Sequence, residues 1–180
     1  MEVVTSQAVL QLVEQFGRRA QEPVRLYLLG GSAMLLLGSP RATKDIDYDL
    51  DVGEADNEAI QRILGDLAGE LRLDIEFVPL AEFVPLPPGF VDRHRLIGRF
   101  GMVELFVFDP YSLALSKIAR GFEADLEDVR FLHRTGIVHL DELRSMFNAV
   151  LPDARQADVD PVEFKQYFAE LERLIEEGGE

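Results

Sequence analysis

The amino-acid sequence predicts an α/β (α+β) fold, with a β-sheet flanked by helices and a helical segment at the C-terminal end. Within residues 1–108, short apolar runs typical of strands alternate with stretches that have the apolar spacing of helices. The remaining residues show helical spacing. The 180 residues are 47% hydrophobic, so the chain can bury a substantial core. We therefore expect a core of residues 1–108 with a helical segment, residues 109–180, packed on it as one compact unit.

The first part of the chain is predicted to alternate helices and strands. Val9, Leu12 and Phe16 have helical spacing, and Pro23 follows as a helix stop. The apolar run between Pro23 and the next glycines is typical of a buried strand. Later stretches repeat these two patterns. The expected helices cover residues 6–19, 33–37 and 58–71, and the expected strands cover residues 24–29, 46–52 and 73–78.

Residues 79–108 are predicted to contain a stiff loop and a hairpin. Prolines within residues 84–89 exclude a helix or a central strand there, so this loop is either a connector or a gate for a substrate. Two strand-like runs follow, at residues 96–99 and 102–108, with Gly101 near the turn between them.

The C-terminal segment is predicted to be helical. Asp109 suits the N-cap position, and Pro110 is favoured at the first helical position. A second helix carries Asp125 and Asp128 on one face, three residues apart. The last two helices are expected at residues 139–151 and 161–177, the second with a broad apolar face that begins at Val162.

The charge and composition of the chain limit its partners. There are 33 acidic residues against 18 Lys and Arg, a formal net charge of −15, and no basic stripe that could follow an extended duplex. The longest apolar run is far shorter than the roughly 20 residues of a membrane span. The chain has no cysteine, which excludes disulfides and thiolate metal sites and fits a cytoplasmic protein. We therefore expect no membrane contact and no extended nucleic-acid interface.

The candidate site combines a glycine motif with two carboxylates. Gly30 and Gly31 let the backbone approach a ligand closely, and Ser32 adds a hydroxyl where a helix can start. Asp45 and Asp47 are two residues apart on a predicted strand, so their side chains lie on one face about 7 Å apart along the chain. Two carboxylates so placed suit Mg²⁺, which typically keeps substrate phosphates as its other ligands.

This order of motifs resembles the DNA-polymerase-β-like nucleotidyltransferase superfamily. The signature of that superfamily is an apolar residue, Gly-Gly or Gly-Ser, roughly a dozen further residues and then Asp-x-Asp, and residues 29–47 match it. Residues 108–128 resemble the second block of small bacterial nucleotidyltransferases, including abortive-infection and toxin–antitoxin members. The resemblance favours a mixed sheet more strongly than the periodicity does.

The resemblance implies a Mg²⁺- or Mn²⁺-dependent nucleotidyltransferase that moves a nucleoside monophosphate from an NTP to a hydroxyl-type acceptor. Asp45 and Asp47 would be catalytic metal ligands, together with a third acid that is either Asp74 or Glu76. We prefer Glu76 as the third metal ligand. Residues implied to contact the nucleotide are Gly30, Gly31, Ser32, Arg41, Thr43, Lys117, Asp125 and Asp128.

Several of these residues have alternative interpretations. Asp74 and Glu76 can both lie on a solvent-exposed strand face without binding a metal. Lys117 can be a surface lysine whose apolar stem packs along its helix. Asp49 and Asp51 continue the alternation of acids, and we expect them to reach water because four carboxylates held together would repel one another.

The function also has alternatives. The acceptor can be tRNA, a protein or a small molecule, and the chain can act as the toxin of a toxin–antitoxin pair with a cognate antitoxin. A non-catalytic nucleotide-binding module, or an antitoxin-like protein-interaction module, can have the same fold. Related proteins usually have an arginine just before the position of Asp125, where this chain has Ala124, so Arg120 or Arg130 would have to substitute for it.

Overall fold

The computed structural model describes residues 3–178, which form two compact units. The first unit contains the chain up to Val78 together with His94–Phe108. The second contains Pro79–Arg93 and the chain from Asp109 onward. Among residues 3–178, no helix has both the length and the apolar character that a membrane crossing requires.

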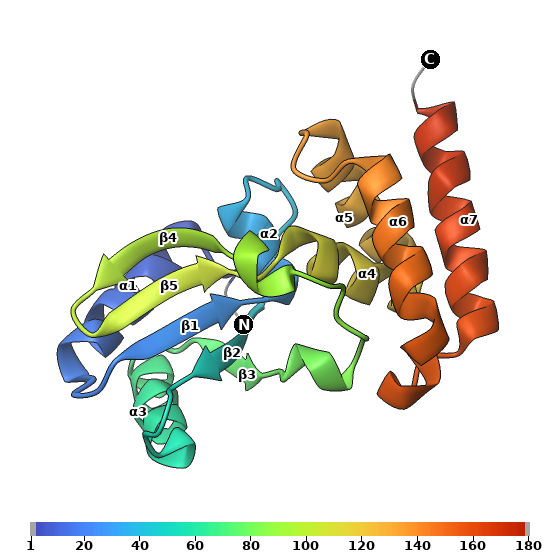
Figure 1. Cartoon of the computed structure of the whole chain (residues 1–180). Helices are drawn as coiled ribbons and strands as arrows, with labels where there is room; N and C mark the ends of the chain where they lie inside the picture. The colour runs from blue at the N-terminus through green and yellow to red at the C-terminus, as the bar shows by residue number, and fades with distance from the viewer. Residues whose placement is uncertain (1–2, 179–180) are drawn as a thin grey trace. The chain divides into compact units, whose positions relative to one another are not determined.

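A five-stranded mixed sheet forms the centre of the first unit (Figure 1). The strands are β1 (Val24–Leu28), β2 (Asp45–Asp51), β3 (Asp74–Phe77), β4 (Arg95–Phe100) and β5 (Val103–Val107), in the spatial order β3-β2-β1-β5-β4. β1 is parallel to β5 and antiparallel to β2. β2 and β3 are parallel, and β4 and β5 form the predicted hairpin.

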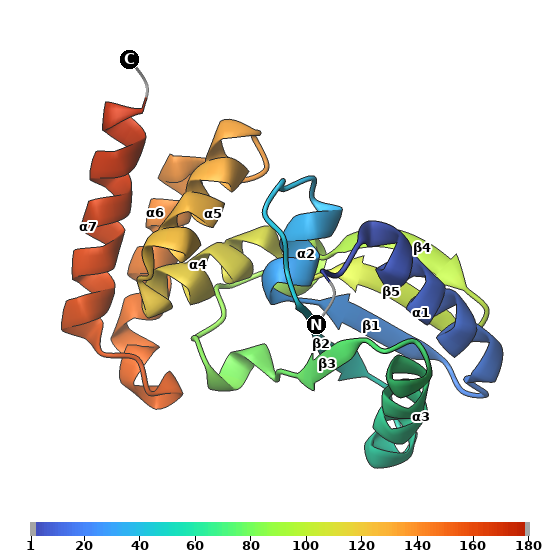
Figure 2. The same ribbon diagram turned by 180° about the vertical axis from the view of Figure 1, so that it is seen from behind.

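Helices cover one face of this sheet. α1 (Ser6–Arg19) packs on β4 and β5, and α3 (Asn57–Glu70) packs on β3 and on α1, as Figure 2 shows from behind. The short α2 (Gly30–Leu36) contacts β2 and α1. Apolar residues of β2 alternate with its acids, and Ile46 and Tyr48 are buried. The acids of β2 therefore lie on the face opposite the helices.

The second unit is helical. Its helices are α4 (Pro110–Arg120), α5 (Glu123–Arg134), α6 (Leu140–Val150) and α7 (Pro161–Glu177), with short 3₁₀ helices at Leu80–Glu82, Phe90–Arg93 and Leu151–Ala157. Phe147 of α6 packs against Phe164 and Phe168 of α7, with ring centroids 4.7 and 4.2 Å apart. Asp109 caps α4 by accepting hydrogen bonds from the backbone N–H groups of Tyr111 and Ser112.

The structure confirms the predicted α/β (α+β) class and most element positions. Three details differ. The proline-rich loop contains 3₁₀ turns and buries Leu80 and Val84, because its apolar side chains pack into the second unit. The acidic linker after α6 also forms a 3₁₀ helix. Val162 is 59% exposed, because the buried face of α7 begins only at Phe164.

Candidate functional site

Four carboxylates lie on one face of the sheet, on two neighbouring strands. Asp45 is opposite Asp74, and Asp47 is opposite Glu76. Opposite residues of adjacent strands project to the same face, and on β2 this is the face away from Ile46. Asp47 is half-buried and the other three acids are exposed. The register thus brings together both aspartates and both candidates for the third acid.

The start of α2 packs directly against this acidic strand. Gly30 has a φ of +52°, in the left-handed region that favours glycine. A Cβ atom at Gly30 would overlap the carboxylate of Asp47, and one at Gly31 would overlap the hydroxyl of Thr43. The two glycines therefore let the helix approach β2. The expected glycine turn is in fact the first turn of α2, which begins at Gly30 rather than at residue 33.

Ser32 fixes the same junction by hydrogen bonding. Its hydroxyl is fully buried and lies 2.9 Å from the carbonyl oxygen of Leu29 and 3.3 Å from that of Asp47. The backbone N–H of Leu29 also donates to the Asp47 carbonyl, at 3.0 Å. These bonds hold the backbone of β2 at Asp47 against the start of α2. Since the Ser32 hydroxyl donates to the protein, its contact with a triphosphate stays a prediction.

Thr43 connects Asp45 to the rest of the unit. Its nearly buried hydroxyl lies 3.1 Å from Oδ1 of Asp45 and 3.2 Å from the Asp45 carbonyl oxygen. Its own carbonyl accepts a hydrogen bond from the backbone N–H of Val4, at 2.9 Å. A hydroxyl that donates to one carboxylate oxygen limits the rotation of that carboxylate. Thr43 is therefore placed to orient Asp45. Arg41, two residues earlier, is exposed.

Lys117, Asp125 and Asp128 form a buried charge cluster in the second unit. The Lys117 ammonium nitrogen lies 2.6 Å from Oδ2 of Asp128 and 3.6 Å from Oδ1 of Asp125, and all three side chains are at most 5% exposed. Arg120 Nε is 3.0 Å from Oδ2 of Asp125, in a geometry that leaves this oxygen without a hydrogen bond. The alternative of a surface lysine is therefore wrong, and a triphosphate contact by Lys117 stays a prediction.

Aromatic side chains lie beside the acids on the open face of the sheet. Tyr27 is opposite Asp49 on β2 and opposite Phe106 on β5, and its ring centroid is 5.4 Å from that of Phe106. The ring of His94 is 4.6 Å from Tyr27. Burial, with a further contribution from the charge of Asp51, raises the pKa of Tyr27. The Tyr27 phenol is therefore neutral at physiological pH. It forms an uncharged surface next to the acids of β2.

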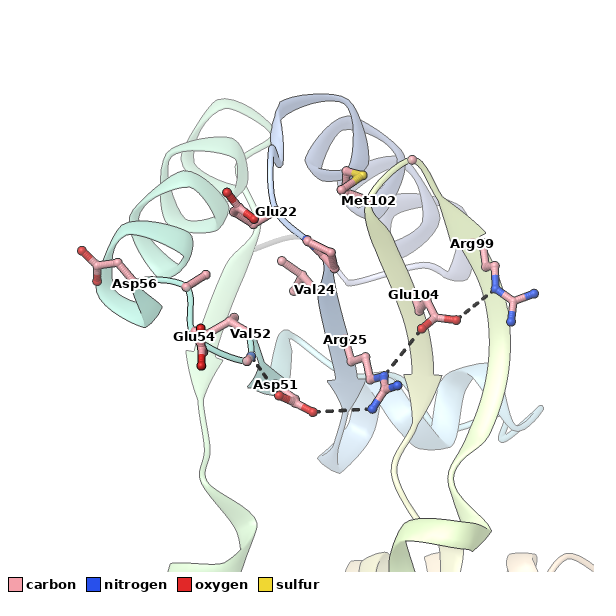
Figure 3. A pocket seen from close by; sticks show the side chains of 14 residues that line it. Glu22, Val24, Arg25, Asp51, Val52, Glu54, Asp56, Arg99, Met102 and Glu104 are labelled. Atoms are coloured by element: carbon pink, nitrogen blue, oxygen red, sulfur yellow. Dashed lines mark hydrogen bonds and ion pairs between the residues drawn. The ribbon is translucent and has the colours of Figure 1, made fainter.

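The far end of the same sheet has an open hollow, shown in Figure 3. Arg25 lies 3.7 Å from Asp51 and 3.6 Å from Glu104, and Arg99 lies 2.9 Å from Glu104. The side chain of Asp51 is about half exposed, so it reaches water as expected and also pairs with Arg25. These ion pairs involve both arginines of the hollow. Asp51 pairs with Arg25 at the opposite end of β2 from Asp45, so it does not belong to the same site.

Comparison with known protein families identifies the chain's relatives. A family model described as a nucleotidyltransferase of unknown function (DUF6036) matches residues 7–172. The chain belongs to this family. Comparisons with curated proteins and with solved structures found no match. Membership of DUF6036 supports a general nucleotidyltransferase role, and it confirms that part of the resemblance inferred from the sequence.

The acids of this DUF6036 chain fit a hard divalent cation only if the substrate helps to bind it. Among the residues that the structure describes, no group of three His, Cys, Asp or Glu side chains could hold a metal ion. Mg²⁺ commonly binds through one or two carboxylates, with substrate phosphates and water as its other ligands. Asp45 and Asp47 offer that donor chemistry, and the overlap that a Cβ at Gly30 would make shows how closely the backbone borders one of them.

Sequence reasoning missed a buried ion pair at the start of α4 in this DUF6036 protein. Nε and Nη2 of Arg93 lie 3.0 and 2.9 Å from the two carboxylate oxygens of Asp109, which is fully buried. From its position before Pro110, Asp109 is expected only to cap α4. No local pattern indicates the partner, because 16 residues separate it from Asp109. The pair ties the proline-rich segment to α4 within the second unit.

Thr43→Val is expected to weaken metal binding, because valine keeps the shape of threonine but cannot donate to Asp45. Loss of a group that orients a ligand typically costs 10- to 100-fold in metal affinity. Electron paramagnetic resonance titration of the whole chain with Mn²⁺ measures this change directly. Thr43→Ser retains the hydroxyl and should stay close to the wild type. Equal Mn²⁺ affinity in the Val and Ser variants would remove the orienting role.

Proposed function

We propose that the chain is a Mg²⁺- or Mn²⁺-dependent nucleotidyltransferase of the DNA-polymerase-β-like superfamily, which transfers a nucleoside monophosphate from an NTP to an acceptor hydroxyl. Membership of DUF6036 supports nucleotidyl transfer in general. The metal, the superfamily and the roles of individual residues are our proposal. Asp45 and Asp47 would hold the metal with phosphate oxygens of the NTP. Bound there, the metal would neutralise negative charge that develops on the phosphate oxygens.

One observation supports this proposal most: two acids on one strand face are positioned by contacts from the glycine motif and from Thr43. Gly30 borders the Asp47 carboxylate, and Thr43 donates to Asp45. Acids that served only to keep a strand edge soluble would not need a glycine in the left-handed region or a nearly buried hydroxyl beside them. Such positioning is typical of a site whose ligands must hold a fixed geometry.

The reaction can be written with the residues that face this site. The acceptor oxygen forms a bond to the α-phosphorus of the NTP, the bond from that phosphorus to the bridging oxygen of the β-phosphate breaks, and pyrophosphate leaves. The acceptor proton would pass to Glu76 or Asp74, which lie in register with Asp47 and Asp45. The role of Asp45 and Asp47 would be to hold positive charge beside the phosphates.

Incubation of the chain with each α-labelled NTP, cell extract and Mg²⁺ or Mn²⁺ tests the proposal. We expect one extract component to become labelled, and nuclease or protease treatment then shows whether the acceptor is RNA or protein. Asp47→Asn should give no label. If the wild-type chain labels nothing with any NTP while it binds NTP, the proposal fails. Growth arrest on expression, lost in Asp47→Asn, would test the toxin role that the sequence resemblance implies.

A second function, nucleotide binding without turnover, is favoured by one observation. The described residues contain no ready group of three metal-binding side chains, so the chain provides fewer fixed ligands than a site prepared for catalysis. Such a module would bind NTP with the same glycine motif and act through a partner protein. Calorimetry would then show NTP binding, and the labelling experiment would show no transfer.

A further inference from the structure

A second hollow lies at the β3 edge of the first unit. The start of α1, the residue before β2 and the turn between α3 and β3 contribute to its lining, which includes Thr5, Ala8, Lys44, Arg72 and Asp74. Asp74 is also one of the two candidates for the third acid and lies opposite Asp45. The hollow therefore adjoins the acidic face on the side of β3.

Two basic side chains of this hollow have no acidic partner among residues 3–178. Neither Lys44 nor Arg72 forms an ion pair or a side-chain hydrogen bond within residues 3–178, and both are exposed. Most arginines of this acidic chain are paired with a carboxylate, Arg19 with Glu70 for example. Among the residues that line the hollow, these two cations outnumber the single carboxylate, Asp74, which favours an anion there.

The backbone at Arg72 strengthens this interpretation. Arg72 follows α3 with a φ of +57°, a conformation that disfavours side chains and usually selects glycine after a helix. An arginine there adopts a disfavoured backbone conformation, and its side chain forms no hydrogen bond or ion pair within residues 3–178. Strained residues of this kind often serve a ligand. The first turn of α1, which borders the hollow, carries no acidic residue, and the positive end of a helix dipole also favours an anion.

We propose that this hollow binds a phosphate group of the acceptor, which makes the acceptor a phosphorylated molecule such as a nucleotide or the end of a polynucleotide. This inference rests on the proposed function. The NTP would lie against Asp45 and Asp47 beside α2, whereas Lys44 and Arg72 lie at the β3 edge with Asp74, the side on which the third acid would receive the acceptor proton. A phosphate held there would place the neighbouring hydroxyl of the acceptor near the acids.

The test is a titration of the full chain with inorganic phosphate in the absence of metal and NTP. Changes in the amide NMR chemical shifts measure the binding. We expect shifts at the start of α1 and at residues 72–74. The double variant Lys44→Gln, Arg72→Gly should bind phosphate at least about tenfold more weakly, since each lost contact is a hydrogen bond to a charged group. The matched control is Arg62→Gln in α3, since Arg62 is exposed and has no ion pair within residues 3–178; this variant should bind phosphate as the wild type does.

Two further measurements on the variants complete the experiment: the thermal unfolding midpoint and the affinity for ATP. Arg72→Gly should raise the unfolding midpoint by about 2–4 °C, because glycine relieves the left-handed strain. The same variant should lose phosphate binding. ATP affinity should not change in the double variant. Unchanged phosphate affinity in that variant, or no phosphate binding by the wild type, overturns the proposal, and an equal loss of ATP affinity would assign the hollow to the NTP. Because phosphate binding needs no turnover, failure of the labelling experiment leaves this result interpretable.

Discussion

Asp47→Asn is expected to reduce labelling by at least about a hundredfold, and Asp45→Asn by a similar factor. Each removes one of two negative charges that would hold the metal against the phosphates, an effect that is worth several kcal/mol in sites of this kind. Initial rates with the best α-labelled NTP, measured at saturating Mg²⁺, give the factor directly. Asparagine is the right replacement, because its side-chain oxygen at position 45 can still accept the hydrogen bond from the Thr43 hydroxyl.

The same strand supplies the control for these variants. Asp51 lies on the same face as Asp47, but at the far end of β2 beside Arg25, so Asp51→Asn should leave labelling near the wild-type rate. Asp45→Asn should not lower the unfolding midpoint, since removing a charge from an acidic row relieves repulsion. Asp51→Asn should lower it little, because its ion pair with Arg25 is about half exposed. Equal labelling by the wild type and the Asp47→Asn variant would show that β2 is not the catalytic strand.

The sequence predicts the acidic strand well because local physics decides it. Alternation with a period of two places Ile46 in the core and Asp45 and Asp47 opposite, and the structure has this arrangement. The parallel register with β3 is a tertiary property, so the sequence could identify Asp74 and Glu76 only as a pair of candidates. The structure assigns each its neighbour on β2, and the choice of third acid stays open because both lie on the same face.

The glycine motif shows what a pattern cannot give. Gly30, Gly31 and Ser32 indicate a phosphate-binding turn by their types alone. In the folded unit, Ser32 donates to two carbonyl groups and the glycines border Asp47 and Thr43. These contacts depend on how a strand 15 residues away packs against α2. The motif therefore supports the acids structurally, whatever phosphate it also binds.

Lys117 shows the same limit on a helix. Its spacing with Leu113 and Arg120 places it where an apolar face meets a basic one, a pattern that a surface lysine also has. Its partners, Asp125 and Asp128, belong to the next helix, and only the packing of α4 on α5 brings the three together. The residues that the sequence selected are thus clustered, in a buried environment that the periodicity does not indicate.

Lys117→Ala is expected to lower the free energy of unfolding by about 3–5 kcal/mol, because it removes the ammonium group that lies 2.6 Å from the buried carboxylate of Asp128 and 3.6 Å from that of Asp125. Urea denaturation followed by circular dichroism measures this loss. It is a large share of the roughly 5–15 kcal/mol that stabilises a typical domain, so NTP affinity must be measured where the variant is still folded.

Arg120→Ala is the matched control for this stability prediction. Its side chain is 64% exposed although it approaches Asp125, so its loss should cost no more than about 1 kcal/mol. Adding Asp125→Asn and Asp128→Asn to Lys117→Ala should recover part of the lost stability, because neutral amides are less costly to bury than carboxylates that have lost an ammonium partner. If the alanine variants of Lys117 and Arg120 were equally stable, the lysine would not be neutralising buried charge, and its ammonium would be available to a triphosphate after all.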